Sequence, residues 1–288
     1  MAALGSDPNH IFITGDLGFM ALENVRESFG SRFINAGVAE QNMIGVAAGL
    51  AKDGYKVFVY SIAPFCYARP YEQIRNDICL AKLSVCLVGN GGGYAYGYMG
   101  PTHHALEDCA AMNALGVKVL VPSFDEDIPL MLSTINNPTY LRLGYDIRPK
   151  NSIINSWEPW RMVLEGNTGV IVTLGPLAGS AMQAFIDVPT SQRPSVWAVT
   201  EFSELEVPEL FWEQAEGNDI YVIEEHVQYG GLASLLALLA VRLGVKFSSF
   251  SHRYALRYPS GRYGSQEFHR IECGLDINGI KRMVFGKN

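Results

Sequence analysis

Short β-rich runs alternate with helix-forming segments along the first half of this chain, and this alternation is the strongest constraint on its fold. The expected strands lie at residues 10–14, 32–35, 55–60, 83–88, 118–121 and 139–143. The expected helices lie at residues 24–29, 40–51, 71–80 and 106–115, with another after Pro122. Strands that alternate with helices pair in parallel, and the helices cover both faces of the sheet. The pattern therefore predicts an α/β domain with a mainly parallel sheet.

The second half of the chain shows the same alternation. Strands are expected at residues 169–174, 196–199, 219–223 and 247–254, and helices at residues 179–185 and 231–243. The segment between the halves contains prolines, polar residues and two tryptophans, which is typical of a linker that packs on a surface. A chain of 288 residues is long enough for two domains of ordinary size. We therefore expect two three-layer α/β/α domains, at residues 1–150 and 166–288, joined by a linker at residues 151–165.

Charge and cysteine spacing exclude several classes of protein. The formal net charge is -7, and Lys and Arg form no run, which argues against a broad nucleic-acid surface. The five cysteines form no CxxC pair and no His-linked spacing, so no metal site is expected in this chain. The N-terminus lacks a secretory signal, and the most apolar expected helix, residues 232–243, is too short to cross a bilayer. We expect a soluble, cytoplasmic protein with buried, reduced thiols.

Glu40 lies in an unusual setting, within the stretch FINAGVAEQNMIGVAAGL at residues 33–50. Small and apolar residues stand on both sides of it, and a poorly solvated carboxylate has a raised pKa, which suits proton transfer. A structural interpretation is also open, because an acidic residue at the start of a helix is stabilised by the helix dipole. The residues alone favour this structural interpretation.

A glycine-rich loop at residues 89–104 follows the fourth expected strand. Its sequence, GNGGGYAYGYMGPTHH, matches neither the phosphate-binding loop nor the dinucleotide-binding fingerprint. Glycines let a backbone approach a ligand closely, so a flexible loop over a ligand is expected. His103 and His104 end the loop. Adjacent loop histidines point in different directions, so metal binding by both is not expected. One of them as a hydrogen-bond donor to a substrate is one interpretation, and a surface histidine is the other, which the residues alone favour.

The other chemical signals are sparse. Asp16 follows the first expected strand, at the edge where open α/β sheets place their ligands. GxSxG and HExxH motifs are absent, and no complete catalytic constellation is visible. If Glu40 takes part in chemistry, it must therefore act on a bound cofactor or together with a partner chain.

Eight motifs occur in a fixed order along the chain. They are GDL (15–17), GVAEQNMIGVAAGLA (37–51), Phe65 followed by RPYEQIRN (69–76), GPTHHALED (100–108), VLVPSFDE (119–126), YLRLG (140–144), VIEEHVQYGGLAS (222–234) and GSQEFHRIECGLDINGI (264–280). In this order they resemble the transketolase family, and most closely the C-terminal subunit of split, two-chain transketolases. The resemblance covers almost the whole chain, and AEQNM together with GPTH is its most specific part.

The resemblance implies a thiamine diphosphate enzyme whose site is shared between chains. Residues 1–150 would be the pyrimidine-binding domain and residues 166–288 the transketolase C-terminal domain. The GDG-type domain that binds the diphosphate and magnesium is missing from this sequence. A partner chain would supply it and hold the metal, and an α2β2 heterotetramer is expected. The implied reaction is the transfer of a two-carbon ketol unit from a ketose to an aldehyde.

The resemblance also implies roles for single residues. Glu40 would bond the aminopyrimidine ring and activate the cofactor, and His103 would contact a substrate oxygen. The remaining residues implied near the cofactor are Phe65, which would stack on the aminopyrimidine, Ile62, which would line the same pocket, and Asp16 and Arg69.

Three departures from the family pattern concern the substrate. Gly97, Tyr98 and Met99 stand where the family usually has GED, Gly91 stands where a histidine is common, and Tyr145 stands where a phosphate-binding arginine often follows the strand. Each departure removes a polar contact. We therefore expect a substrate with fewer hydroxyl groups or without a phosphate.

Two other functions stay open at this point. One is the β subunit of an oxoacid-decarboxylating complex of the pyruvate dehydrogenase type, which shares this pair of domains. The other is a non-catalytic assembly module that kept the fold and lost activity, which the altered loop at residues 97–99 allows.

Overall fold

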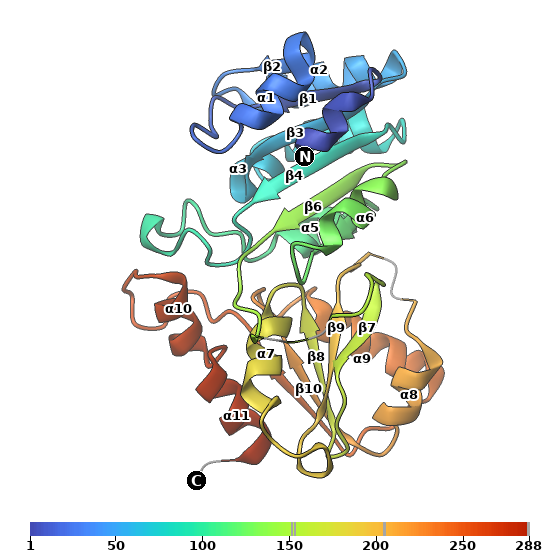
Figure 1. The fold of residues 1–288 in the computed structure, drawn as a ribbon, viewed down its shortest axis with the longest axis vertical. Helices are drawn as coiled ribbons and strands as arrows, with labels where there is room; N and C mark the ends of the chain where they lie inside the picture. The colour runs from blue at the N-terminus through green and yellow to red at the C-terminus, as the bar shows by residue number, and fades with distance from the viewer. Residues whose placement is uncertain (151, 153, 204–205, 287–288) are drawn as a thin grey trace.

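The computed structural model describes residues 1–150, 152, 154–203 and 206–286. They form two α/β domains, drawn one above the other in Figure 1. The first domain contains a six-stranded parallel sheet and the second a five-stranded mixed sheet. The expected fold class is confirmed.

The sheet of the first domain has the strand order β2-β1-β3-β4-β6-β5. Every neighbouring pair is parallel. The strands are β1 His10–Thr14, β2 Phe33–Asn35, β3 Lys56–Ile62, β4 Val85–Asn90, β5 Lys118–Leu120 and β6 Thr139–Leu143. Both faces of this sheet are covered: Val57 and Val59 lie in one hydrophobic cluster, and Phe58 and Tyr60 lie in another. This explains why β3 reads as a continuous apolar run rather than as an alternating one.

The helices of the first domain follow the expected positions with one correction. They are α1 Glu23–Phe29, α2 Glu40–Lys52, α3 Ala63–Tyr67, α4 Tyr71–Gln73, α5 Asp108–Ala114 and α6 Asp127–Ser133. A π-helical turn, Ile74–Cys79, continues α4. Pro64 predicts a loop at residues 61–69, but α3 forms there. Proline is tolerated in the first helical turn, since its missing N–H would have no partner there in any case.

The second sheet has the strand order β11-β10-β8-β9-β7. Its strands are β7 Trp160–Leu164, β8 Val170–Leu174, β9 Ser195–Val199, β10 Asp219–Ile223 and β11 Ser249–Arg253. Its helices are α7 Leu177–Phe185, α8 Glu209–Ala215, α9 Leu232–Leu243, α10 Gln266–Cys273 and α11 Ile277–Phe285. β7 pairs antiparallel with β9, although residues 160–164 fall within the range expected for the linker. Residues 151 and 153 of that range lie outside the described residues.

The two domains share backbone hydrogen bonds and a core. The amide of Val121 donates to the carbonyl of Thr200 at 2.7 Å, and the amide of Val227 donates to the carbonyl of Leu106 at 2.8 Å. One hydrophobic cluster includes Val57 of the first sheet and Val172 of the second. A core that runs across both sheets fixes the position of one domain against the other.

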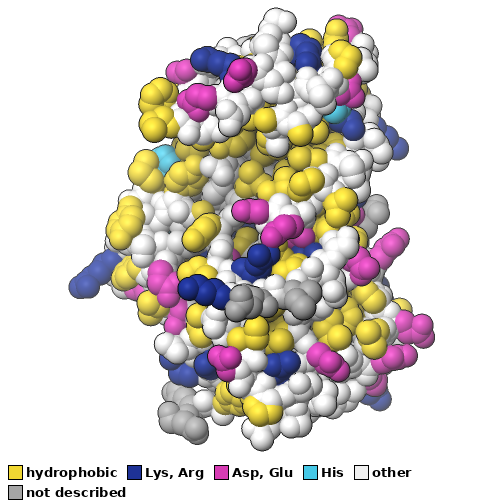
Figure 2. Space-filling view, in the orientation of Figure 1, with side chains coloured by type: hydrophobic (Ala, Val, Ile, Leu, Met, Phe, Trp, Pro, Cys, Tyr) yellow, Lys and Arg dark blue, Asp and Glu magenta, His cyan; other side chains and the backbone are white. Residues whose placement is uncertain are grey.

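The surface carries mixed charges. Figure 2 shows dark blue and magenta side chains interspersed on one face, with hydrophobic side chains gathered in its upper part, over the first domain. Within the described residues, no helix has the length and apolarity needed to cross a membrane. All five cysteines carry free thiols, and four of them are buried.

Candidate active site at the carboxyl edge of the first sheet

The carboxyl ends of the parallel strands meet at one edge of the first sheet. In Figure 1, β4 and β6 both point to the left, and the loop after β4 leaves from this edge toward α10. All six residues implied at the site lie at or just beyond this edge. They are Asp16 after β1, Glu40 at the start of α2, Ile62 at the end of β3, Phe65 in α3, Arg69 after α3, and His103 in the loop after β4.

Glu40, Arg69 and Phe65 form one compact group. Nη1 of Arg69 donates to Oε1 of Glu40 at 2.6 Å, and the Arg69 guanidinium carbon lies 3.7 Å from the centroid of the Phe65 ring. Glu40 is buried, with 6% of its side chain exposed, whereas 45% of the Arg69 side chain is exposed. A cavity of about 460 Å³ opens beside them and is lined by Val38, Glu40, Asn42 and Arg69 among others. The buried carboxylate thus has one charged partner, which reaches it from the solvent side.

His103 joins this group from the loop after β4. Its ring centroid lies 5.1 Å from that of Phe65, with the rings steeply inclined to each other at 67°. Its Nδ1 shares a hydrogen bond of 2.9 Å with the hydroxyl of Thr102. Its ring is half-buried, so the remaining nitrogen of the imidazole can serve a ligand.

The neighbouring His104 points into the molecule instead. Its Nδ1 shares a hydrogen bond of 2.9 Å with the Tyr258 hydroxyl, and its Nε2 lies 3.0 Å from the Gly97 carbonyl oxygen. Burial lowers the pKa of His104. The two adjacent histidines therefore do different things: His103 faces the site, while His104 anchors the loop to the second domain.

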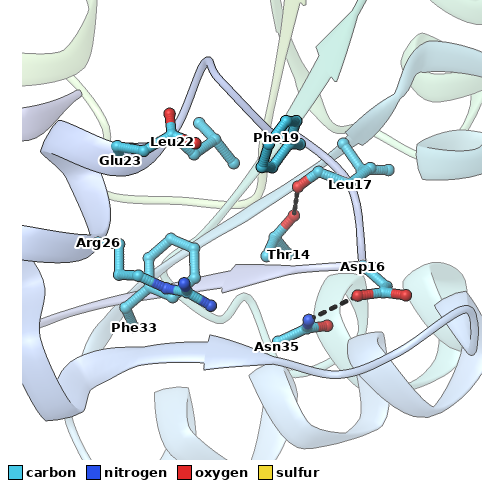
Figure 3. Close-up of a pocket in the computed structure, with 10 residues that line it drawn as sticks. Thr14, Asp16, Leu17, Phe19, Leu22, Glu23, Arg26, Phe33 and Asn35 are labelled. Carbon is cyan, nitrogen blue, oxygen red and sulfur yellow. Dashed lines mark hydrogen bonds between the residues drawn. The ribbon is translucent and has the colours of Figure 1, made fainter.

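Asp16 and Ile62 lie at the same edge but outside this group. Asp16 has a φ of 57°, a left-handed conformation that is uncommon for a non-glycine residue, and it accepts a hydrogen bond of 2.8 Å from Nδ2 of Asn35. Figure 3 shows this bond beside a small cavity of about 180 Å³, with Thr14 and Phe19 also on its wall. Ile62 is half-buried and directly precedes α3. Neither residue contacts the Glu40–Arg69 pair through a hydrogen bond among the described residues.

Thiols and metal ligands add little to this site. Burial is the main cause that raises the pKa of Cys66, the thiol nearest the group, to about 12, so it stays protonated at neutral pH. In the part of the chain that the structure describes, no three His, Cys, Asp or Glu side chains are grouped so that they could hold a metal ion.

Several residues that shape the site were not found from the sequence. Glu225 accepts a hydrogen bond of 2.6 Å from the amide of Tyr94 in the loop after β4. Arg142, buried at the end of β6, donates to Asp108 and to the carbonyl of Ala105 at 2.8 Å each. A charged residue inside the apolar strand YLRL was the available signal, since arginine is rarely buried without a partner. These contacts hold both ends of the loop that carries His103.

Comparison with known proteins agrees with this fold and site. Residues 1–144 match the family described as transketolase, pyrimidine binding domain. A protein of Methanocaldococcus jannaschii, named as a candidate transketolase C-terminal section, is 39% identical over 267 residues, which cover 90% of this chain and 83% of that one. The family match spans half of the chain, and the Methanocaldococcus jannaschii relative matches most of it. The chain belongs to the transketolase family.

Two further relatives show which part of a transketolase this chain resembles. One of the separate subunits of the apulose-4-phosphate transketolase of Phocaeicola vulgatus is 28% identical over 240 residues, which cover 80% of this chain and 77% of that one. The solved structure of a split-gene transketolase, an inactive β4 tetramer, superposes with a TM-score of 0.80 at 27% identity, covering 98% of this chain and 93% of that one. The chain is thus similar, over most of both lengths, to separate C-terminal subunits.

Proposed function

We propose that this chain is the C-terminal subunit of a split, thiamine diphosphate-dependent transketolase. In this proposal the first domain, within residues 1–150, binds the aminopyrimidine ring, and the second domain, which begins with β7 at Trp160, is the C-terminal domain. A partner chain holds the diphosphate and its magnesium ion, and the two chains assemble as an α2β2 heterotetramer. The free thiols suit the cytoplasm, where we place the complex.

One observation carries the proposal: a planar group with N–H donors already fits between Glu40 and Phe65. The Arg69 guanidinium lies over the Phe65 ring and donates to the Glu40 carboxylate. An aminopyrimidine is also flat and also carries N–H donors, so the same two side chains suit it. Arg69, which is nearly half exposed, would move aside when the ring binds.

In the assembled enzyme, thiamine diphosphate supplies a carbon nucleophile that carries the two-carbon unit between substrates. The role of this chain is to bind and orient the ring and to hold a proton. Glu40 would bond a ring nitrogen and share its proton with it, Phe65 would stack on the ring, and Ile62, Asp16 and Arg69 would lie around it. His103 would donate a hydrogen bond to a substrate oxygen.

The overall transfer is balanced without an oxidant. The bond between C2 and C3 of the ketose breaks, the C3 hydroxyl gives up its proton, and the remainder leaves as an aldehyde two carbons shorter. A new carbon–carbon bond forms to the carbonyl carbon of the acceptor aldehyde, whose oxygen takes up the proton. A proton donor is therefore required near that oxygen. His103 lies beside Phe65 at the carboxyl edge of the first sheet, which suits this role.

We further propose that the substrate of this enzyme lacks a phosphate group. Relatives include proteins named for phosphorylated sugars, such as 1-deoxy-D-xylulose-5-phosphate synthase of Clostridium perfringens. In this chain, however, Tyr145 lines the cavity of about 420 Å³ that lies past β6. Arg148 is the basic residue on its wall, and Arg148 pairs with Glu126 at 2.5 Å. With Asp125 and Asp146 also on the wall, the cavity is a poor site for an anion.

Calorimetric titration tests the shared site. The purified chain, alone and in complex with a diphosphate-binding transketolase subunit, is titrated with thiamine diphosphate and magnesium. We expect the complex to bind at least about 100-fold more tightly, because the isolated chain offers only half of the contacts. Equally tight binding by the isolated chain would rule out the shared site. In the same complex, a preference for xylulose 5-phosphate over a non-phosphorylated ketose would rule out the proposed substrate class only.

A further inference from the structure

The loop after β4 folds back so that Tyr96 covers Gly91. A Cβ atom built on Gly91 would clash with Cε2 and Cδ2 of the Tyr96 ring. Gly91 also has a φ of +79°, which disfavours other residues. The Tyr96 ring thus fills the space that a side chain at position 91 would take. The polar side chain expected from the family at that position is replaced by an aromatic face from five residues further on.

The Tyr96 ring is held in this position. Its hydroxyl oxygen accepts a hydrogen bond of 2.8 Å from Nδ2 of Asn90, the last residue of β4. The ring is half-buried, so one part of it packs on the backbone while another faces outward. A ring fixed by both packing and a hydrogen bond presents a defined surface rather than a mobile side chain.

Tyr96 continues the row of site residues. Its ring centroid lies 6.2 Å from that of His103, and the His103 ring lies 5.1 Å from that of Phe65. The row therefore runs from Glu40 and Phe65, where the reaction would take place, past His103 to Tyr96. A carbon chain whose carbonyl oxygen is bound by His103 would extend away from Phe65 along the Tyr96 face.

We propose that Tyr96 is a specificity-determining residue, and that its ring selects a substrate whose carbon chain beyond the reacting carbonyl is apolar rather than hydroxylated. This inference rests on the proposed function and adds the substrate class to it. An aromatic face offers dispersion and hydrophobic contact to CH₂ and CH₃ groups, whereas a hydroxyl placed against it loses its hydrogen bonds to water. The loop has thus exchanged a polar contact for an apolar one.

The test compares two acceptor aldehydes of equal carbon number, propanal and glyceraldehyde, in the assembled complex with hydroxypyruvate as donor. The donor gives up its two-carbon unit and releases CO₂, and the unit forms its new bond to the acceptor aldehyde carbon. We expect the wild-type kcat/KM to favour propanal by roughly tenfold or more, the range typical of one or two apolar contacts in a pocket. Tyr96→Ala should abolish this preference by lowering kcat/KM for propanal alone.

Two more variants test whether the Tyr96 ring, rather than its hydroxyl, causes the preference, and whether a polar side chain in its place reverses it. Tyr96→Phe keeps the ring and should keep the preference. Gly91→Asn combined with Tyr96→Ala restores a polar side chain, since Asn tolerates a positive φ, and should turn the preference toward glyceraldehyde. Tyr229→Ala, which changes a tyrosine 80% exposed on the second domain, is the matched control and should change neither value.

The outcomes distinguish this inference from the proposed function. An equal loss for both aldehydes in Tyr96→Ala would mean that Tyr96 only supports the loop, and this would overturn the inference alone. A wild-type preference for glyceraldehyde would overturn it as well. No transfer to either aldehyde by the wild-type complex would overturn the proposed function and the inference with it.

Discussion

The site and the junction between the domains both contain buried carboxylates, but they satisfy them differently. Glu40 has one charged partner, Arg69, whose side chain is 45% exposed. Glu225 at the junction accepts from Arg270 at 2.7 Å, and 6% of each side chain is exposed. Glu225 also accepts from the amide of Tyr94 and from Gln266. Among the described residues Glu225 thus has three hydrogen-bonding partners, whereas Glu40 has one.

This difference indicates what each region is for. Arg270 bridges Glu225 and Asp146, and Asp146 in turn accepts from the amide and hydroxyl of Ser180 at 2.8 Å. Such a closed network fixes one geometry, and here it holds the loop that carries His103. The pair of Glu40 and an exposed arginine is open to exchange for a ligand. This contrast supports the proposal that the chain supplies a rigid framework and part of a site that a partner chain completes.

The largest predicted effect comes from breaking the junction. Arg270→Met leaves Glu225 and Asp146 buried without their cation, and we expect the free energy of unfolding to fall by about 3–5 kcal/mol. Arg148→Met is the matched control: Arg148 and Glu126 are 42% and 61% exposed, and their pair is worth less than about 1 kcal/mol. Guanidinium denaturation followed by circular dichroism measures both. Equal falls in the free energy of unfolding for Arg270→Met and Arg148→Met would contradict the contrast between the junction and the surface.

Acid should weaken the junction through His104. Burial lowers the pKa of His104 in the folded chain below its ordinary value of 6.5. Below that pH the unfolded state binds a proton that the folded state does not, so the free energy of unfolding should fall by up to about 1.4 kcal/mol per pH unit until the lower folded pKa is reached. Above pH 6.5 this contribution is fully present.

The His104→Asn variant isolates this effect. It keeps polar atoms next to the Tyr258 hydroxyl and the Gly97 carbonyl but removes the titrating ring. Tyr94, His269 and Glu225 also lie around His104 and stay unchanged. Between about pH 7.5 and about pH 5, the free energy of unfolding should fall less steeply in the variant than in the wild type. The reason is that unfolding of the variant takes up one proton fewer. If the free energy of unfolding of the variant depended on pH as it does in the wild type, His104 would not be the group that weakens the junction in acid.

The smallest effect is expected at the site. Arg69→Ala removes a half-exposed ion pair and a cation–π contact, which together contribute about 1 kcal/mol. The start of α2 still stabilises the Glu40 carboxylate through the helix dipole. Denaturation of the isolated subunit should therefore show a loss several-fold below that of Arg270→Met. A loss as large as that one would show that the Glu40 pair is part of the structural framework rather than a site open to a ligand.

Much of this fold could be predicted from apolar runs. β3 and β10 are buried, β-rich strands, and the sequence signals them directly. The helices α8, α10 and α11 were not expected, since each has nine residues or fewer and is shorter than the stretch over which helical periodicity becomes clear. The edge strand β7 was absorbed into the expected linker because its pairing with β9 depends on a distant segment. Segments whose burial depends on docking against remote elements leave little local signal.

In the candidate site, too, some features were predicted from the sequence and others depend on contacts between remote segments. Motifs pointed to Glu40, Phe65, Arg69 and His103, and the structure brings these four together, while their roles stay predictions. The pairing of Arg69 with Glu40 was not expected, because the two residues are far apart in sequence and meet only through the order of the strands. The same is true of the Tyr96 ring over Gly91, which depends on how the loop folds back.

The central claim is that Glu40 activates a cofactor held jointly with another chain, and one variant tests it most directly. The complex with a diphosphate-binding subunit is assayed for two-carbon transfer with wild-type chain, with Glu40→Gln, and with Glu27→Gln, an exposed glutamate of α1 that serves as the control. We predict that Glu40→Gln assembles normally and loses activity by about 10² to 10⁴, as expected for a positioned proton-transfer group, while Glu27→Gln is unaffected. Normal turnover by the Glu40→Gln complex would contradict the account.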